Sequence, residues 1–270
     1  MAEEKTSPRK SADMNFWGHL DELRGVLVRI AVVVIVFGVV FFIFMPWIFD
    51  NVILAPCRAS FPLYKLFDMI APDSTPPDFQ VNLINIQLAS QLFIHLSASG
   101  WLAAVFSFPV IIYLLWTFVS PALYPEEKRN SRTAFLFGNI MFYFGVAVGY
   151  FLVFPLTLRF LATYQLSDLI PNTITLDSYM DNFLSICLVM GAVFELPLVA
   201  WLLGKIGLLN RSFFNTYRRH AIVALLIVAA LITPTGDPFT LFVVFLPIYM
   251  LWELSSRLVP AANPEPAEEN

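Results

Sequence analysis

Two short clusters of acidic and basic side chains offer the clearest chemistry in this sequence. One is HLDELR, from His19 to Arg24, which directly precedes an uncharged run from Ile30 to Phe49; the other is ALYPEEKR, from Ala122 to Arg129, which directly follows a second long apolar segment. Carboxylates bind guanidinium groups through charge-assisted, bidentate hydrogen bonds. If the two segments cross a membrane in opposite directions, both clusters emerge on one face, where one acid from each forms an anionic site. The alternative is that the clusters are interfacial, solvated by lipid headgroups and paired locally.

The composition excludes a soluble domain. The chain is 58% hydrophobic and only 13% charged, with a mean hydropathy of +0.72. Runs of about 20 apolar residues match the hydrocarbon thickness of a bilayer, and helices satisfy their own backbone hydrogen bonds there. The sequence therefore predicts an all-α fold, a polytopic helical membrane protein. The first apolar run follows a mixed-charge leader and precedes no small-residue cleavage site, so we expect a retained helix and not a signal peptide.

Six apolar segments predict six transmembrane helices within one membrane domain, residues 1–259. The expected spans are 26–48, 84–119, 134–154, 179–203, 217–233 and 239–252. We expect the second span to be broken at Pro109, the third to end before Pro155, and the fourth to be N-capped by Asp177. The fifth and sixth are short and form a hairpin that turns at Thr233 to Pro238. Residues 260–270 are rich in Pro, Ala and Glu and are expected to be disordered.

The distribution of basic residues predicts the orientation. With six spans and both termini in the cytoplasm, thirteen Lys and Arg side chains fall on the cytoplasmic side and three on the other side. This is a strong positive-inside bias. The external loop from Asp50 to Asn82 contains five prolines and an amphipathic piece around Phe61 to Ile70. We expect this loop to be a rigid cap, with a helix on the membrane surface as the alternative.

Enzyme chemistry has little support in the sequence. The three histidines are scattered, neither Cys57 nor Cys187 has a partner at metal-ligand spacing, and there is no glycine-rich phosphate loop. We expect no enzymatic activity, no cofactor, no metal site and no nucleic-acid partner. His95 is interpreted as a packing residue.

Glu195 is the only acidic or basic side chain between Asp181 and Lys205. A charge at the centre of a membrane helix costs roughly 2.5–3.5 kcal/mol, so this carboxyl should face protein or water. Pro197 should loosen the helix nearby. Three roles stay open: a protonated group hydrogen-bonded inside the bundle, a proton relay, and a contact for the polar side chain of a partner helix.

Four motifs, taken together, resemble the TatC family, the polytopic receptor subunits of the twin-arginine protein translocase. They are HLDELR, FVSPALYPEEKR from Phe118, FELPL from Phe194, and TPTGDPFT from Thr233, and the resemblance covers roughly Asn15 to Arg257. It implies a multi-pass protein of the bacterial cytoplasmic (inner) membrane that recognises twin-arginine signal peptides and exports folded proteins, driven by the proton motive force. It also implies the single-span partners TatA and TatB, contact with membrane lipid, and homo- and hetero-oligomers.

The resemblance also assigns roles to residues. The matched signal-peptide-binding residues are Glu22, Glu127, Arg24, Phe118, Pro121 and Leu123. Glu195 matches the family's contact for a partner helix, Pro56 a proline of the first external loop, and Asp237 an acid at the last external turn. The sequence departs from the family pattern at Val26, where a base is usual, and at Thr235 and Gly236 within the last motif.

Two other functional classes remain as alternatives. A proton-coupled secondary transporter would use Glu195 and His95 as a midplane site, but the sequence has no evident internal repeat, which many such transporters carry. An assembly scaffold without a substrate site predicts that both charged clusters can be neutralised without effect.

Overall fold

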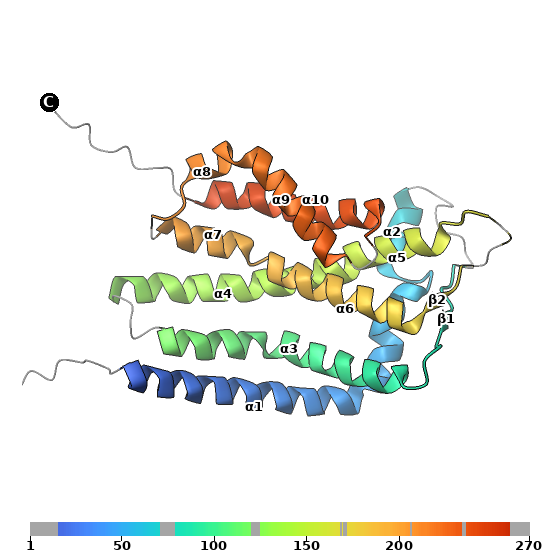
Figure 1. The fold of residues 1–270 in the computed structure, drawn as a ribbon, viewed down its shortest axis with the longest axis horizontal. Coiled ribbons are helices and arrows are strands. Elements are labelled where there is room, and N and C mark those ends of the chain that lie inside the picture. Colours follow the sequence, from blue (N-terminus) through green and yellow to red (C-terminus); the bar gives the residue numbers. More distant parts are fainter. Residues whose placement is uncertain are drawn as a thin grey trace, which may run out of the picture.

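The computed structural model describes residues 16–70, 79–119, 125–167, 169, 172–205, 207–233 and 236–259 of the chain. The fold is a polytopic bundle of helices, as the composition predicts (Figure 1). Five helical segments in the described residues are long and apolar enough to cross a membrane: Leu20–Cys57, Ser90–Phe118, Phe135–Thr163, Leu176–Lys205 and Pro238–Leu258. The expected fifth span corresponds to a shorter helix of 15 residues, Arg218–Ile232.

The elements follow one another with few long connections. The first half of the chain forms α1 (Phe16–Ile48), a π-helical turn (Phe49–Ile53), a 3-10 turn (Ala55–Cys57), α2 (Pro62–Ile70), β1 (Leu83–Ile84) and α3 (Ser90–Val119). The second half forms α4 (Pro125–Val148), a π-helical turn (Gly149–Val153), α5 (Phe154–Thr163), β2 (Ile174–Thr175), α6 (Leu176–Val193), α7 (Leu196–Lys205), α8 (Arg211–Thr216), α9 (Arg218–Ile232) and α10 (Pro238–Leu258). The strands β1 and β2 pair in parallel, Leu83 with Ile174 and Ile84 with Thr175.

Figure 1 shows the helices side by side, from α1 at one edge to α9 and α10 at the other. The start of α1 and the end of α10 lie at the same end of the bundle, which we call the termini end. The opposite end, which we call the cap end, carries α2, both strands and the far end of α5. α3 ends and α4 begins at the termini end, so the chain crosses the bundle twice between the two charged motifs, once in α1 and back in α3.

Two expected helix boundaries at prolines are wrong. α3 runs without a break through Pro109, and it begins at Ser90 because residues 83–84 are used by β1. The third span continues beyond Val148 through a π-helical turn into α5, where Pro155 occupies the first helical turn. Pro155 has no N–H to donate to the preceding turn, and the π-helical turn lies directly before it in the chain. Within a membrane, neighbouring helices and local π adjustments satisfy the backbone groups that an internal proline leaves free.

The start of α6 also differs from the prediction. Thr175, and not Asp177, is the N-cap: its backbone is extended and its Oγ1 accepts a hydrogen bond from the backbone N–H of Ser178 at 3.2 Å. Asp177 lies in the first turn, where its Oδ2 accepts a hydrogen bond from Oγ of Ser90 at 2.8 Å. The carboxylate that was expected to cap α6 therefore ties α6 to the start of α3.

The last helix is longer than expected. α10 has 21 residues and continues past Trp252, where the sequence becomes charged. It can do so because Glu253 is paired, accepting hydrogen bonds from Arg218 of α9 at 2.6 Å and from the hydroxyl of Tyr249 at 2.8 Å. α9 and α10 pack against each other, and only α9 is short.

The core lies around α6, which packs against α3, α4, α5 and α9. The buried side chains that α6 contributes are Tyr179, Met180, Phe183, Ile186, Cys187 and Met190. α4 approaches α6 closely because Gly145 has no side chain. A Cβ at that position would lie 2.5 Å from the carbonyl oxygen of Met190.

The described part of the loop after α1 packs against the bundle at the cap end. Phe61, Leu63 and Tyr64 are buried in a cluster of their own, so α2 packs on protein. The hydroxyl of Tyr64 donates to the carbonyl oxygens of Pro56 and Pro155, at 3.0 and 3.2 Å. Because these carbonyls belong to the first and third spans, Tyr64 fastens the two together at the cap end.

Candidate functional site

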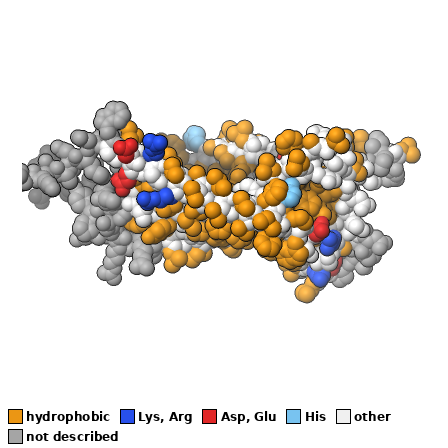
Figure 2. Space-filling view, turned by 90° about the horizontal axis from the view of Figure 1, so that it is seen from below, with side chains coloured by type: hydrophobic (Ala, Val, Ile, Leu, Met, Phe, Trp, Pro, Cys, Tyr) orange, Lys and Arg blue, Asp and Glu red, His pale blue; other side chains and the backbone are white. Residues whose placement is uncertain are grey.

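The first charged cluster lies on the opening turns of α1, at the termini end. Glu22 and Arg24 are both exposed. Figure 2 views the molecule from below the orientation of Figure 1; acidic and basic side chains lie at the two ends of the face seen there, and hydrophobic side chains cover its middle. The cluster therefore marks the boundary of the lipid-facing surface, in agreement with its expected place at a membrane interface.

The second charged cluster is only partly described. Pro121 and Leu123 lie outside the described residues; Glu127 belongs to α4, but its side chain also lies outside them. Phe118 is half-buried in the last turn of α3. The backbone nevertheless places the start of α1, the end of α3 and the start of α4 at the same end of the bundle (Figure 1). The topology thus carries both motifs to one end, as an anionic site shared between them requires.

The surface around these motifs suits a bilayer. α1 packs mainly against α3, and its other side exposes large apolar residues along its length. They include Leu27, Val32, Ile35, Val39, Ile43 and Trp47, each more than half exposed. An apolar face of this extent is characteristic of a helix that contacts lipid.

Glu195 lies at a break between two helices. α6 ends at Val193 and α7 begins at Leu196, so the fourth span consists of two helical segments joined at Phe194 and Glu195. The sequence predicted this loosening from Pro197, which is buried in the first turn of α7. Backbone hydrogen bonds join the junction to both helices: the N–H groups of Phe194 and Glu195 donate to carbonyl oxygens of α6 at 3.1 Å, and the N–H of Val199 donates to the carbonyl oxygen of Glu195 at 3.0 Å.

The carboxyl group of Glu195 is directed toward α4. A Cβ at Gly138 of α4 would lie 3.0 Å from Oε2 and 3.6 Å from Oε1 of this carboxyl. Oε1 is buried, and no described residue forms a hydrogen bond with it. An unpaired buried polar group costs about 1–3 kcal/mol. Among the described contacts, the hydrogen-bonding capacity of this carboxyl is therefore not satisfied.

The surface beside Glu195 is apolar. Three exposed apolar side chains follow it on α7, Leu196, Val199 and Leu202, and the exposed ring of Phe144 on α4 packs on the neighbouring Phe194, with ring centroids 5.6 Å apart. A second helix packed on these side chains would bury them, and it would bring a polar side chain within reach of the carboxyl.

His95 does not share a site with Glu195. Its Nε2 lies 2.9 Å from the carbonyl oxygen of Phe42 and its ring stacks on the Phe42 ring at 4.1 Å, so it packs α3 on α1. Glu195 faces α4 instead. The packing role expected for His95 is confirmed, and the described contacts do not form the midplane pair that a transporter would use.

The two remaining matched residues have structural environments. Pro56 is buried in the 3-10 turn, and its carbonyl oxygen accepts the hydrogen bond from Tyr64. Asp237 N-caps α10, because its Oδ1 accepts a hydrogen bond from the backbone N–H of Thr240 at 2.7 Å. Over the ranges that are described, no group of three or more His, Cys, Asp or Glu side chains could hold a metal ion, and both cysteines are buried as free thiols.

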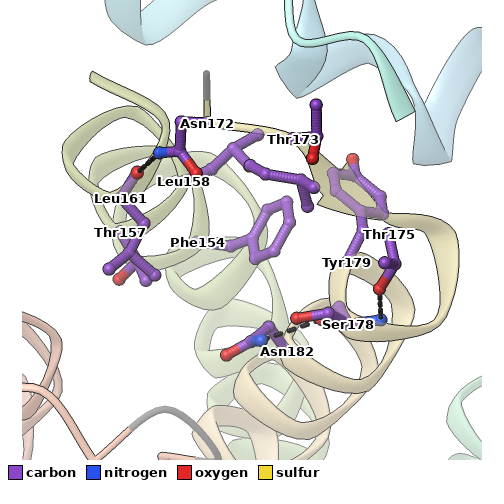
Figure 3. Close-up of a pocket in the computed structure, with 11 residues that line it drawn as sticks. Phe154, Thr157, Leu158, Leu161, Asn172, Thr173, Thr175, Ser178, Tyr179 and Asn182 are labelled. Carbon is purple, nitrogen blue, oxygen red and sulfur yellow. Dashed lines mark hydrogen bonds between the residues drawn. The ribbon is translucent and has the colours of Figure 1, made fainter. Parts of the chain in front are cut away.

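Sequence reasoning missed a cavity at the cap end. It lies between α5, β2 and α6 and has a volume of about 370 Å³ (Figure 3). Its walls combine apolar and uncharged polar side chains: Phe154, Thr157, Leu158, Leu161, Asn172, Thr173, Ile174, Thr175, Ser178, Tyr179 and Asn182. These residues come from three elements and share no motif, so nothing in the sequence signals the cavity.

Comparison with known proteins gives consistent matches. Residues 18–247 match the family model for "Sec-independent protein translocase protein (TatC)". Relatives of that name include those of Campylobacter jejuni, 34% identical over 93% of this chain and 96% of the relative, and Blattabacterium, 31% identical over 90% and 94%. Crystal structures of the twin-arginine translocase receptor TatC, one of them in the detergent DDM, are 28% identical and cover 89% of this chain. Their TM-scores are 0.70 and 0.73, and the match covers 97% and 99% of those chains.

Proposed function

Because the chain belongs to the TatC family of Sec-independent protein translocase proteins, we propose that its termini end is the receptor surface for twin-arginine signal peptides. The protein is then a non-enzymatic subunit of a translocase that exports folded proteins across the bacterial inner membrane, driven by the proton motive force. Both termini lie in the cytoplasm, where signal peptides are presented.

One observation carries this proposal. The start of α1, which bears HLDELR, and the start of α4, which bears Glu127, lie at the same end of the bundle, and Glu22 is exposed there. Glu22 and Glu127 each accept hydrogen bonds from one guanidinium of the arginine pair. Arg24, Phe118, Pro121 and Leu123 complete the patch around the bound peptide. Lysine cannot replace arginine at such a site, because an ammonium group cannot form the planar bidentate pair.

The test is peptide binding by the full-length protein. Glu22→Gln and Glu127→Gln should each weaken binding of a twin-arginine signal peptide markedly, because a charged hydrogen bond contributes roughly 1.5–3 kcal/mol when the bound peptide excludes water and less at a wet interface. Asp21→Asn is the matched control. Asp21 is the neighbouring exposed acid and points about 100° away around the helix, so its loss should change binding little.

The outcome that refutes the receptor site is equally direct. If the Glu22→Gln/Glu127→Gln variant binds the twin-arginine peptide as well as the unchanged protein, the two acids do not form the site. Equal binding of a twin-lysine peptide by the unchanged protein would also contradict it.

Glu195 has a separate function in the same complex. It contacts a polar side chain of a single-span partner, TatA or TatB, whose helix covers the apolar surface of α4 and α7. The support is its buried oxygen without a described hydrogen-bond partner and the exposed side chains beside it. Glu195→Ala should reduce cross-links to the partner and impair export, while leaving signal-peptide binding nearly unchanged.

Glu195→Gln separates docking from proton transfer. Glutamine retains the hydrogen-bonding capacity of the side chain but cannot carry a proton. Export by the Gln variant alongside loss in the Ala variant supports docking. Complete loss in both variants, with partner cross-links intact, would instead support a proton-coupled role for Glu195.

A further inference from the structure

Gly138 lies where α4 passes the junction between α6 and α7. A Cβ built on it would lie 2.6 Å from Cδ2 of Leu198 and 3.0 Å from Oε2 of Glu195. The first distance is shorter than real Cβ contacts, and the second is tighter than most of them. The side chains of Leu198 and Glu195 therefore occupy the space that any side chain at position 138 would need.

This close approach differs in kind from the one at Gly145. The atom nearest to a Cβ at Gly145 is a backbone oxygen of α6, so Gly145 determines how closely two helices pack. The atoms nearest to a Cβ at Gly138 are the far ends of two side chains. Such ends can move without moving a helix. A methyl group at position 138 should therefore displace the Glu195 carboxyl first, and the α4 or α7 backbone only to a smaller extent.

The two side chains are geometrically linked. Glu195 and Leu198 are three residues apart, so they lie on the same face at the start of α7. Both side chains point at Gly138, so the Glu195 carboxyl lies between the α4 backbone and the Leu198 side chain. An acid at this depth is costly if it meets lipid directly. Oε1 is buried while Glu195 as a whole is half-buried, so a partner can reach the carboxyl only from the side that remains exposed.

We propose that Gly138 is a positioning residue for the Glu195 carboxyl. Its missing side chain sets the place and direction in which Glu195 is presented to the partner helix. The proposal rests on the proposed docking function of Glu195 and adds a residue of another helix to that site. An interhelical hydrogen bond in a membrane depends on such placement, because the partner's polar side chain has few rotamers that reach one fixed depth.

The experiment uses the full-length protein expressed with TatA and TatB, carrying a photo-cross-linking side chain at Val199 on the exposed surface of α7. Gly138→Ala should reduce cross-links to the single-span partner about fivefold, the change expected for loss of one interhelical hydrogen bond. Gly100→Ala is the control, because a Cβ at that position meets nothing within 4 Å. Signal-peptide binding should not change in either variant.

A second substitution separates positioning from packing. Leu198→Ala removes the atom 2.6 Å from the new methyl group but leaves the contact with Oε2 at 3.0 Å. The Gly138→Ala/Leu198→Ala variant should therefore regain thermal stability relative to Gly138→Ala while its cross-links stay reduced, whereas Leu198→Ala alone keeps them. Recovery of both stability and cross-links in the double variant would overturn the positioning role.

Glu195→Ala in the same series distinguishes the two possible failures. If Glu195→Ala retains full cross-linking, the proposed docking function is itself wrong. If Glu195→Ala loses the cross-links while Gly138→Ala retains them at the level of the unchanged protein, docking stands and the positioning role of Gly138 is refuted.

Discussion

The packing of α4 on α6 should not tolerate even a methyl group at Gly145. Its Cβ would lie 2.5 Å from the carbonyl oxygen of Met190 and 2.7 Å from Cβ of Phe194. Neither atom is the end of a flexible side chain, so relief requires a shift of one helix. Overpacking of this kind costs about 1–3 kcal/mol. Replacing glycine by alanine within a helix returns about 0.5–1 kcal/mol. We therefore expect Gly145→Ala to lower the free energy of unfolding by about 1–2 kcal/mol.

The assay is denaturant unfolding of the purified protein in detergent, followed by circular dichroism. Gly100→Ala and Gly38→Ala are the matched controls on α3 and α1. A Cβ meets nothing within 4 Å at Gly100, and only Cβ of Ala103 at 3.8 Å at Gly38. Both controls should be neutral or slightly more stable than the unchanged protein. If Gly145→Ala unfolds together with the controls, the close approach of α4 to α6 does not limit stability and the reasoning fails.

Three other predictions follow from described contacts. Tyr64→Phe removes two hydrogen bonds to buried carbonyls and should cost about 1–3 kcal/mol in denaturant unfolding. Burial raises the pKa of the Tyr64 hydroxyl above its usual value of 10.0, so this contribution should fade as the pH rises above 10; a pH-independent difference between the two proteins would contradict it. Glu253→Gln should lower stability by no more than about 1 kcal/mol because the Arg218 side chain is 51% exposed; a larger loss would show that the pair is less screened than this. Reporter fusions after Leu209 and after Val259 should both report the cytoplasm, and an external signal from either would refute the proposed orientation.

The spans could be predicted from the sequence more reliably than their ends. An uncharged run of about 20 residues has one stable solution in a bilayer, which is a helix. Helix ends depend instead on groups that are distant in the sequence. The end of α10 needed the pairing of Glu253 with Arg218, and Asp177 does not cap α6 because Ser90 of α3 engages it. Neither partner could be identified without the fold.

In the candidate site, too, some residues could be identified from the sequence and others could not. Glu195 was identifiable because a single acid in a long apolar run needs a reason to be there. Gly138 was not, since a glycine in an apolar helix carries no pattern that specifies its neighbour. The cavity at the cap end was also invisible in the sequence, because its walls come from α5, residues 172–175 and α6, whose arrangement in space no motif specifies. A single charge in a membrane sequence therefore indicates a functional position, whereas a close helix contact at a glycine or a cavity leaves no signal in the sequence.

Hydrogen bonds at the cap end hold the segment that follows α1 in place. The hydroxyls of Tyr64, Tyr150 and Tyr179 all donate to backbone oxygens of the segment that follows α1, binding it to the third and fourth spans. At the termini end, α1 lies at the edge of the bundle and packs mainly against α3. α3 also packs on α4, through the rings of Phe108 and Phe142 and of Trp116 and Phe135. The distance between the two charged motifs is therefore set by two separate groups of contacts, the tyrosine hydrogen bonds at the cap end and the aromatic rings between α3 and α4.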